Sequence, residues 1–427
     1  MIDQHSLVSR GRRDARLLTP IAYLACVECG KRYQPSPDLY VCHDCGLRGI
    51  LDVSYAYDRA HISRESLAAD PERSIWRYLP LLPITQTETI PDLHVGWTPL
   101  YHARRLGEQL GLRQLYIKDD GRNPTGSFKD RASALGVAKG REFGRRTITC
   151  ASTGNAASSL AGFAACAGVE TYIFVPAGAP EAKVTQLLVY GAHVLLVDGS
   201  YDEAYYLCNE AAERFGWYNR NCAINPYLIE GKKTVGFEIC EQFDWVVPDR
   251  VIMAVGDGCS IAGAAKAFRE LMQLGLTDRV PRMTGVQAEG CAPLTLAFER
   301  NEEPVTLRPQ TLADSIAVGE PRNARKALDA IRSSGGTMVS VSDEAILEAM
   351  TFLARATGVF GEPAGTAALA GLRQLVERGE IDPDERVVVV VTGNGLKDIK
   401  SAQRVAGTAS HIRPVLADVE RVLEGMA

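Results

Sequence analysis

The segment Gly121-Arg-Asn-Pro-Thr-Gly-Ser-Phe-Lys129-Asp-Arg131 connects a predicted buried strand, Leu115–Lys118, to a helix predicted from Ala132 onward. Asn-Pro and Thr-Gly favour turns, so we expect Lys129 where the helix opens, at the mouth of a sheet. A lysine there can attack a carbonyl if burial or a nearby cation lowers its pKa. A lone lysine at a helix start is more often a solvated side chain, so this interpretation depends on the rest of the chain.

On both sides of this segment, strand-like and helix-like stretches alternate. The strand candidates are rich in β-branched residues and lack polar alternation, as strands covered on both faces do. They are Leu115–Lys118, Thr147–Cys150, Thr171–Val175, His193–Val197, Arg250–Val255, Met283–Gln287 and Arg386–Val391. The Ala-rich helical candidates between them are Asn155–Gly168, Pro180–Gly191, Tyr201–Phe215 and Ser260–Leu274. Repeated strand–helix units predict an α/β fold with mostly parallel sheets.

Three further strand ends carry small or polar residues. In Ser152-Thr-Gly-Asn155, N–H groups and hydroxyls at a helix start would suit a carboxylate, although an ordinary N-cap also explains Ser or Asn. Small residues in Val255-Gly256-Asp-Gly258-Cys-Ser260 would let backbone donors close around a phosphate. This segment matches neither a dinucleotide fingerprint nor a Walker loop. Thr392-Gly-Asn-Gly395-Leu-Lys-Asp398 is another polar strand end.

Two Cys-x-x-Cys motifs, Cys26 with Cys29 and Cys42 with Cys45, lie near the N-terminus, and glycine follows each. This spacing is typical of a zinc ribbon, because each tight turn aims two thiolates at one tetrahedral ion. The alternative is a vestigial ribbon that folds without metal. We favour zinc, because four uncoordinated thiolates would have no role in so small a module. His43 is expected to be a bystander.

Composition limits the possible classes of protein. The 427 residues are 46% hydrophobic and 23% charged, with a formal net charge of −5, which suits two globular domains and a small appendage. Scattered basic residues argue against nucleic-acid binding, and no stretch approaches the roughly 20 apolar residues of a membrane helix. The polar start lacks the apolar region of a secretory signal, so we predict a cytoplasmic protein. Cysteines in apolar segments, such as Cys150, Cys166 and Cys240, predict buried reduced thiols.

These motifs occur in the order found in one enzyme family. Further members of the series are Trp97-Thr-Pro-Leu100, Tyr190-Gly-Ala192, Asn225-Pro-Tyr-x-x-Glu-Gly-x-Lys-Thr234 and Glu362-Pro-Ala-Gly365. Over residues 24–400 the chain resembles the fold-type II pyridoxal-phosphate (PLP) enzymes of the tryptophan synthase beta superfamily, and most closely the threonine synthases. A cysteine-knuckle head is also common among these relatives.

The resemblance implies an α/β fold with two doubly wound, mostly parallel sheet domains and an N-terminal zinc-ribbon-like module. The N-terminal segment with this module would span residues 1–57. A large PLP-binding domain would comprise residues 58–130 and 226–427, and a small domain residues 131–225. The resemblance also implies a homodimer that acts on a small-molecule amino acid, with no nucleic-acid or membrane partner.

The resemblance assigns a role to each strand end. Lys129 would carry PLP as a Schiff base and move protons between Cα, Cβ and the cofactor, while Asn155 would hydrogen-bond the ring oxygen. Thr392 would meet the pyridine nitrogen with a neutral hydroxyl, which favours elimination and replacement over transamination. The substrate carboxylate is assigned to Ser152, Thr153 and Gly154. The cofactor phosphate is assigned to Gly256, Asp257, Gly258, Cys259 and Ser260.

Three positions depart from the threonine synthase pattern. These enzymes act on O-phosphohomoserine and need a second anion site, built in the family from a Thr or Ser after the Ser-Thr-Gly-Asn motif, an Asn before Asn-Pro, and an Arg three residues after that dipeptide's Asn. Here these places hold Ala156, Cys222 and Leu228, which would forfeit several charge-assisted hydrogen bonds to a dianion. The cations considered as replacements are Lys232, Lys233 and Arg131.

The best single interpretation is therefore a PLP-dependent lyase of amino-acid metabolism, a threonine synthase that converts O-phosphohomoserine and water to threonine and phosphate. The three departures favour a second enzyme reading, a paralogue that performs β-elimination or β-replacement on serine, threonine or an activated serine. A third reading, from another class, is a non-catalytic metabolite-sensing protein. The presence of Lys129, Asn155 and Thr392 argues against that third reading.

Overall fold

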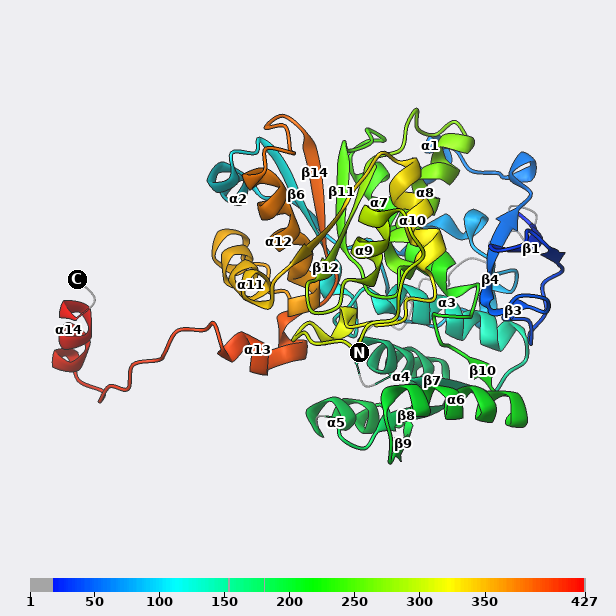
Figure 1. Ribbon diagram of the computed structural model, residues 1–427, viewed down its shortest axis with the longest axis horizontal. Helices are drawn as coiled ribbons and strands as arrows, with labels where there is room; N and C mark the ends of the chain where they lie inside the picture. Colours follow the sequence, from blue (N-terminus) through cyan, green and yellow to red (C-terminus); the bar gives the residue numbers. More distant parts are fainter. Residues whose placement is uncertain (1–17, 153, 180, 426–427) are drawn as a thin grey trace, which may run out of the picture.

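A computed structural model describes residues 18–425 except 153 and 180 (Figure 1). The valine-rich strand β14 (Arg386–Val391) lies at the centre of the larger sheet, whose strands are ordered β13-β12-β11-β14-β6-β5. Its other members are β5 (Leu100–His102), β6 (Gln114–Asp119), β11 (Arg250–Ala254), β12 (Arg282–Ala288) and β13 (Met338–Val341). All pairs are parallel except the edge pair β5–β6, so the predicted α/β fold is confirmed.

Helices cover both faces of this sheet, which explains why its strands are apolar on both sides. Val388 and Val390 of β14 pack into the core that includes α7 and α8, whereas Val389 packs into the core that includes α11 and α12. The helices associated with this sheet are α2 (Arg104–Leu110), α3 (Lys129–Glu142), α7 (Leu228–Gln242), α8 (Cys259–Gln273), α9 (Pro293–Arg300), α10 (Ala324–Ser333), α11 (Asp343–Thr357) and α12 (Pro363–Glu377). Helices α3 and α7 approach closely because Gly231 has no Cβ to meet the Arg131 carbonyl.

The smaller sheet is wholly parallel, in the order β10-β7-β8-β9. Its strands are β7 (Thr147–Ala151), β8 (Glu170–Pro176), β9 (His193–Val197) and β10 (Tyr218–Asn219), and its helices are α4 (Asn155–Ala167), α5 (Glu181–Val189) and α6 (Tyr201–Phe215). The prediction that residues 193–197 are covered on both faces is wrong. Strand β9 lies at the sheet edge, and Leu195 and Leu196 are exposed.

The N-terminal module is a third, antiparallel sheet in the order β2-β1-β4-β3. Its strands are β1 (Ile21–Cys26), β2 (Arg32–Tyr33), β3 (Val41–Cys42) and β4 (Gly46–Tyr55). The module lies beside α8 and α10 (Figure 1), and Lys326 of α10 donates hydrogen bonds to Leu51 O at 2.8 Å and Asp52 Oδ1 at 3.0 Å. A short helix, α1 (Arg64–Ala68), and a 3₁₀ helix, η3 (Ile75–Leu81), lead from the module to the large sheet.

At the other end of the chain, α13 (Ile399–Gln403) is followed by an extended segment and α14 (Leu416–Glu424), which stands away from the body (Figure 1). No helix among the described residues is long and apolar enough to cross a membrane. The predicted domain boundaries at residues 57, 130 and 225 fall between the strands of the three sheets. They stay a prediction.

Candidate active site

Three of the predicted strand ends lie side by side because β11, β14 and β6 are parallel neighbours. Lys129 is the first residue of α3, Cys259 is the first residue of α8, and Thr392 directly follows β14. The lysine loop is attached to the β14 end, since Phe128 N donates to Thr392 O at 2.8 Å. The carboxyl ends of these strands are the edge at which α/β folds bind ligands.

The Lys129 side chain meets the requirements of a carbonyl-attacking amine. It is partly buried, and its Nζ forms no hydrogen bond or ion pair with any residue that the structure describes. Burial lowers the pKa of Lys129 below its ordinary value, and the Lys232 ammonium lowers it further. An amine with a lowered pKa is more often neutral and therefore more nucleophilic.

Asn155 reaches this edge from the smaller sheet. It is the first residue of α4, is buried, and its Nδ2 donates to Glu362 Oε1 at 2.7 Å. Ser152 lies on the loop before α4, where its Oγ accepts from Gly154 N at 3.2 Å. Thr153 lies outside the described residues. The structure thus brings Ser152, Gly154 and Asn155 to the same edge as the strand ends of the large sheet.

Glu362 is a buried carboxylate in the Glu362-Pro-Ala-Gly365 motif, and the sequence alone predicted no role for it. It precedes α12, and its backbone N donates to Gly393 O at 3.0 Å, so it lies against the end of β14. Gly393 is required here because a Cβ would collide with the Glu362 carboxylate. Burial, together with the nearby Asp314 charge, raises the pKa of Glu362 to about 7.

The loop before α8 provides a cradle for an anion. Gly258 has a φ of 95°, and a Cβ there would lie 2.9 Å from Asn323 O, so only glycine suits the position. The Asp257 carboxylate is occupied elsewhere, because it accepts from Arg322 N at 2.7 Å and Asn323 Nδ2 at 3.0 Å. The N-terminal end of α8 carries a partial positive charge, and Gly256 and Ser260 at this end are partly exposed.

These observations fit a phosphorylated pyridoxal cofactor. One sheet edge carries both a partly buried lysine with a lowered pKa and a glycine-rich helix start. The Thr392 side chain, which forms no hydrogen bond within the described residues, lies at the same edge. Beside that edge lies a cleft formed by helices and loops that flank both sheets. It is lined by Gly154, Asn155, Ser158, Lys183, Gln186, Asp314, Ser315, Glu362, Leu396 and Lys397. A more open hollow between α2, α11 and α12 contains none of the predicted motifs.

Two of the three proposed replacement cations are already occupied. The Arg131 guanidinium pairs with Asp120 at 2.6 Å and with Glu238. Lys233 pairs with Glu230 at 2.6 Å and Glu270 at 2.8 Å. These ion pairs argue against Arg131 or Lys233 as a replacement for an arginine at position 228, whereas Lys232 forms no ion pair with a carboxylate among the described residues.

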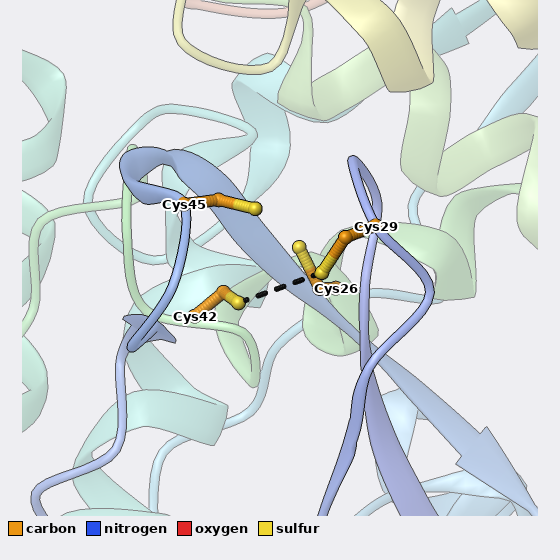
Figure 2. Close-up of side chains that lie close together, drawn as sticks. All are labelled: Cys26, Cys29, Cys42 and Cys45. Carbon is orange, nitrogen blue, oxygen red and sulfur yellow. Dashed lines mark hydrogen bonds between the residues drawn. The ribbon is translucent and has the colours of Figure 1, made fainter.

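The four N-terminal cysteines converge, as Figure 2 shows. The Sγ atoms of Cys26, Cys29, Cys42 and Cys45 all lie within 4.8 Å of one another, and those of Cys29 and Cys42 are 3.7 Å apart. A tetrahedral zinc ion with Zn–S bonds of about 2.3 Å needs sulfur atoms about 3.8 Å apart, so the cluster fits this metal. Cys166, in contrast, is exposed, which corrects its prediction as a buried thiol.

The fold and the strand-end site are those of a fold-type II PLP enzyme, and comparisons with known proteins agree. A model of the pyridoxal-phosphate dependent enzyme family matches residues 91–393. The threonine synthase of Methanocaldococcus jannaschii is 42% identical over 404 residues, which cover 93% of this chain and 98% of that protein. The threonine synthase of Methanosarcina acetivorans is 43% identical over 407 residues, which cover 95% and 98%.

Solved structures show the same architecture. The processed form of threonine deaminase isoform 2 from Solanum lycopersicum is 26% identical with a TM-score of 0.63, and the match covers 72% of this chain and 87% of that one. Maize serine racemase, at 20% identity and a TM-score of 0.60, covers 77% and 93% and supports the fold alone. The chain belongs to the threonine synthase family of pyridoxal-phosphate dependent enzymes.

Proposed function

We propose that the protein is a threonine synthase, a lyase that converts O-phosphohomoserine and water to threonine and phosphate. In this reaction the C–O bond at the substrate γ-carbon breaks, phosphate departs, and water supplies the hydroxyl at the β-carbon. The observation that carries the proposal is identity of 42–43% to threonine synthases over 93–95% of the chain. The uncommitted Lys129 amine at the sheet edge supports it.

Each strand end has a proposed part in this reaction. PLP, when bound, supplies an electron-accepting ring that stabilises negative charge developing beside the substrate amine. Lys129 holds the cofactor and moves protons, while Asn155 orients the ring oxygen and Thr392 meets the ring nitrogen. Ser152, Thr153 and Gly154 receive the substrate carboxylate. The cofactor phosphate is held by the loop of Gly256, Asp257, Gly258, Cys259 and Ser260.

The decisive experiment incubates the holoenzyme separately with O-phosphohomoserine, O-phosphoserine, serine and threonine. Threonine and inorganic phosphate in equal amounts from O-phosphohomoserine would support the proposal. The second candidate is a paralogue acting on serine, threonine or an activated serine, and Ala156, Cys222 and Leu228 favour it because they depart from the family's phosphate site. Keto acid from serine or threonine, or turnover of O-phosphoserine, without turnover of O-phosphohomoserine would establish this candidate instead. No reaction and no absorbance of bound PLP would point to the non-catalytic reading.

We also propose one structural zinc ion per chain at Cys26, Cys29, Cys42 and Cys45. The sulfur spacing supports it, and so does Gly49, where a Cβ would lie 2.6 Å from Cys45 Cβ and 2.7 Å from Cys42 Cβ. Metal analysis of protein purified without chelator should give one zinc per chain. Substoichiometric zinc in fresh protein that is folded and active would instead support the vestigial ribbon.

A homodimer and a cytoplasmic location complete the proposal. The homodimer rests on the family resemblance and is tested by sedimentation or light scattering. The cytoplasmic location is supported by eleven free cysteines, since thiols in oxidising compartments tend to form disulfides. Cell fractionation tests it directly.

A further inference from the structure

Buried cations in this protein are almost always paired with a carboxylate. Among the described residues, the buried lysines and arginines with an acidic partner are Arg77, Lys118, Arg131, Lys139, Lys233, Arg250 and Lys266. Arg220 and Lys232 are the exceptions. They are 1% and 2% exposed, and neither forms an ion pair with a residue of the described chain.

The two exceptions lie together beside Lys129. The Arg220 guanidinium donates to Ser133 Oγ at 3.1 and 2.9 Å, to Cys222 Sγ at 3.1 Å and to the Lys129 carbonyl at 3.5 Å. None of these partners is a carboxylate. Lys232 follows Gly231, which packs directly against the start of α3 that Lys129 opens, and the repulsion of its ammonium lowers the pKa of Lys129.

The start of α8 adjoins this pair. Cys259, the first residue of α8, donates through its thiol to the Cys222 carbonyl at 3.5 Å. Two buried cations and the positive end of a 15-residue helix therefore converge near Lys129. An isolated buried charge is expensive unless an opposite charge compensates it, so this region is built to receive an anion.

Arg220 also lies next to the position where the family pattern has an arginine. An ideal Cβ on Gly136 of α3 would lie 2.6 Å from Leu228 Cδ2 and 3.8 Å from Arg220 Cγ. Both side chains therefore pack against the same point of α3, and both are buried. A guanidinium that starts from residue 220 can occupy the neighbourhood that one starting from residue 228 would occupy.

We propose that Arg220 and Lys232 form the site that binds the phosphate leaving group of the substrate, in place of an arginine at position 228. This inference rests on the proposed function, because it requires a substrate that carries a phosphate. The cofactor phosphate has its own cradle at the start of α8. Two cations suit a departing dianion, and the planar guanidinium offers N–H groups in the fork geometry that phosphate oxygens accept.

Cys222 provides a chemical reporter for this site. It is partly buried, unlike Cys150, Cys208 and Cys240, which are buried. Burial raises the pKa of its thiol, but the three nearby cations outweigh burial and leave the pKa below the ordinary value. A cysteine with a lowered thiol pKa reacts more readily with iodoacetamide, and a phosphate bound to the same cations should slow that reaction.

The kinetic test compares four forms of the holoenzyme with O-phosphohomoserine. Arg220→Leu should lower kcat/KM by about 10- to 100-fold, the effect of losing one charged contact. The exchange Arg220→Leu with Leu228→Arg should recover most of this loss, because it returns a guanidinium to the same neighbourhood. Lys139→Gln is the matched control, since Lys139 is buried but paired with Glu142, and its kcat/KM should stay at the wild-type value.

The binding test needs no turnover. Inorganic phosphate should protect Cys222 of the wild-type holoenzyme from iodoacetamide, as followed by mass spectrometry of the peptide. Arg220→Leu and Lys232→Met should abolish the phosphate dependence of labelling. PLP absorbance of each variant should match that of the wild type.

Three results would overturn the proposal. One is unchanged kcat/KM in Arg220→Leu together with labelling that phosphate does not affect in the wild type. Another is loss of PLP from Arg220→Leu and Lys232→Met, which would assign the cations to the cofactor phosphate. The third is failure of the exchange variant to recover any activity although it folds and binds PLP. If wild type does not turn over O-phosphohomoserine, the proposed function fails. In that case phosphate protection lost in Arg220→Leu still supports the anion site, and absent protection refutes it.

Discussion

Helix α7 carries two adjacent lysines with opposite surroundings. Lys233 belongs to a closed network in which Glu230 accepts from Lys233 at 2.6 Å, Lys266 at 2.7 Å and Tyr55 Oη at 2.7 Å. Lys232, one position earlier, is equally buried but has no acidic partner in the described part of the chain, and the same is true of nearby Arg220.

The paired charges around Lys233 stabilise the fold, whereas the charges of Lys232 and Arg220 are available to bind a ligand. The network around Glu230 joins α7 and α8 to the N-terminal module, and every charge in it is compensated internally. On the Lys232 side, no carboxylate among the described residues forms an ion pair with either cation. Buried charge without a partner is costly, so its retention indicates a binding site. Five substitutions test this comparison.

The largest effect is expected at Lys129, on the uncompensated side. Lys129→Ala should reduce turnover by about a thousandfold or more, because the residue both holds the cofactor and moves protons. Urea unfolding should show little loss of stability, since the Nζ has no partner among the described residues. Borohydride reduction of the wild type should attach the cofactor to Lys129. Cofactor found instead on Lys118 or Lys183 would contradict the assignment.

The adjacent lysines provide the most direct comparison. Lys233→Met should destabilise the protein by about 3–5 kcal/mol, because it leaves Glu230 and Glu270 with an uncompensated buried charge. Lys232→Met should leave the free energy of unfolding unchanged or increase it, because it removes an unpaired charge. Urea titrations of the two variants measure this. Equal destabilisation by both substitutions would show that Lys232 has a structural partner.

A smaller, pH-dependent effect is expected at Glu362, whose pKa is raised from 4.5 to about 7. Protonation of this carboxyl is favoured in the folded state. Its stabilising contribution is therefore full below pH 4.5 and is lost as the pH rises through 7. Glu362→Gln cannot titrate, so it should gain stability relative to the wild type between pH 4.5 and 8, by at most about 3 kcal/mol. Unfolding at several pH values measures the difference, and a constant difference would exclude a raised pKa.

The smallest effect is expected where the module meets the network. Tyr55→Phe removes one hydrogen bond to Glu230, which keeps both lysine partners, so the cost should be about 1.5 kcal/mol. Zinc content and KM for O-phosphohomoserine should not change. A variant with wild-type stability and an altered KM would mean that the module acts on the site rather than on the fold.

Most of the fold could be predicted from the sequence because its strands are short, apolar runs between helices. All seven predicted strands exist, and Tyr201–Phe215 has the predicted bounds of α6. In the two larger sheets, strands β5, β10 and β13 were missed. Of these, β10 has two residues and β13 has four, which is too short for a pattern of buried residues to identify.

The site was only partly predictable, for a different reason. Lys129 and Thr392 follow predicted strands that are neighbours in the larger sheet, so topology brings them to one edge. Asn155 follows a predicted strand of the smaller sheet. Whether a buried charge has a partner, however, depends on contacts between distant residues. Glu238, which pairs with Arg131, is 107 positions away. Nothing in the local sequence distinguishes Lys232 from Lys233, and Arg220 lies outside the predicted motifs.

The contact between the N-terminal module and α10 has a consequence for synthesis on the ribosome. Asp52 and its partner Lys326 are separated by 274 positions, so at about 5–20 residues per second the module would emerge roughly 15–55 s before its partner. All four cysteines lie between positions 26 and 45, so the proposed zinc ion would close the module from local residues alone. The metal would then protect an exposed nascent segment until the rest of the enzyme is made.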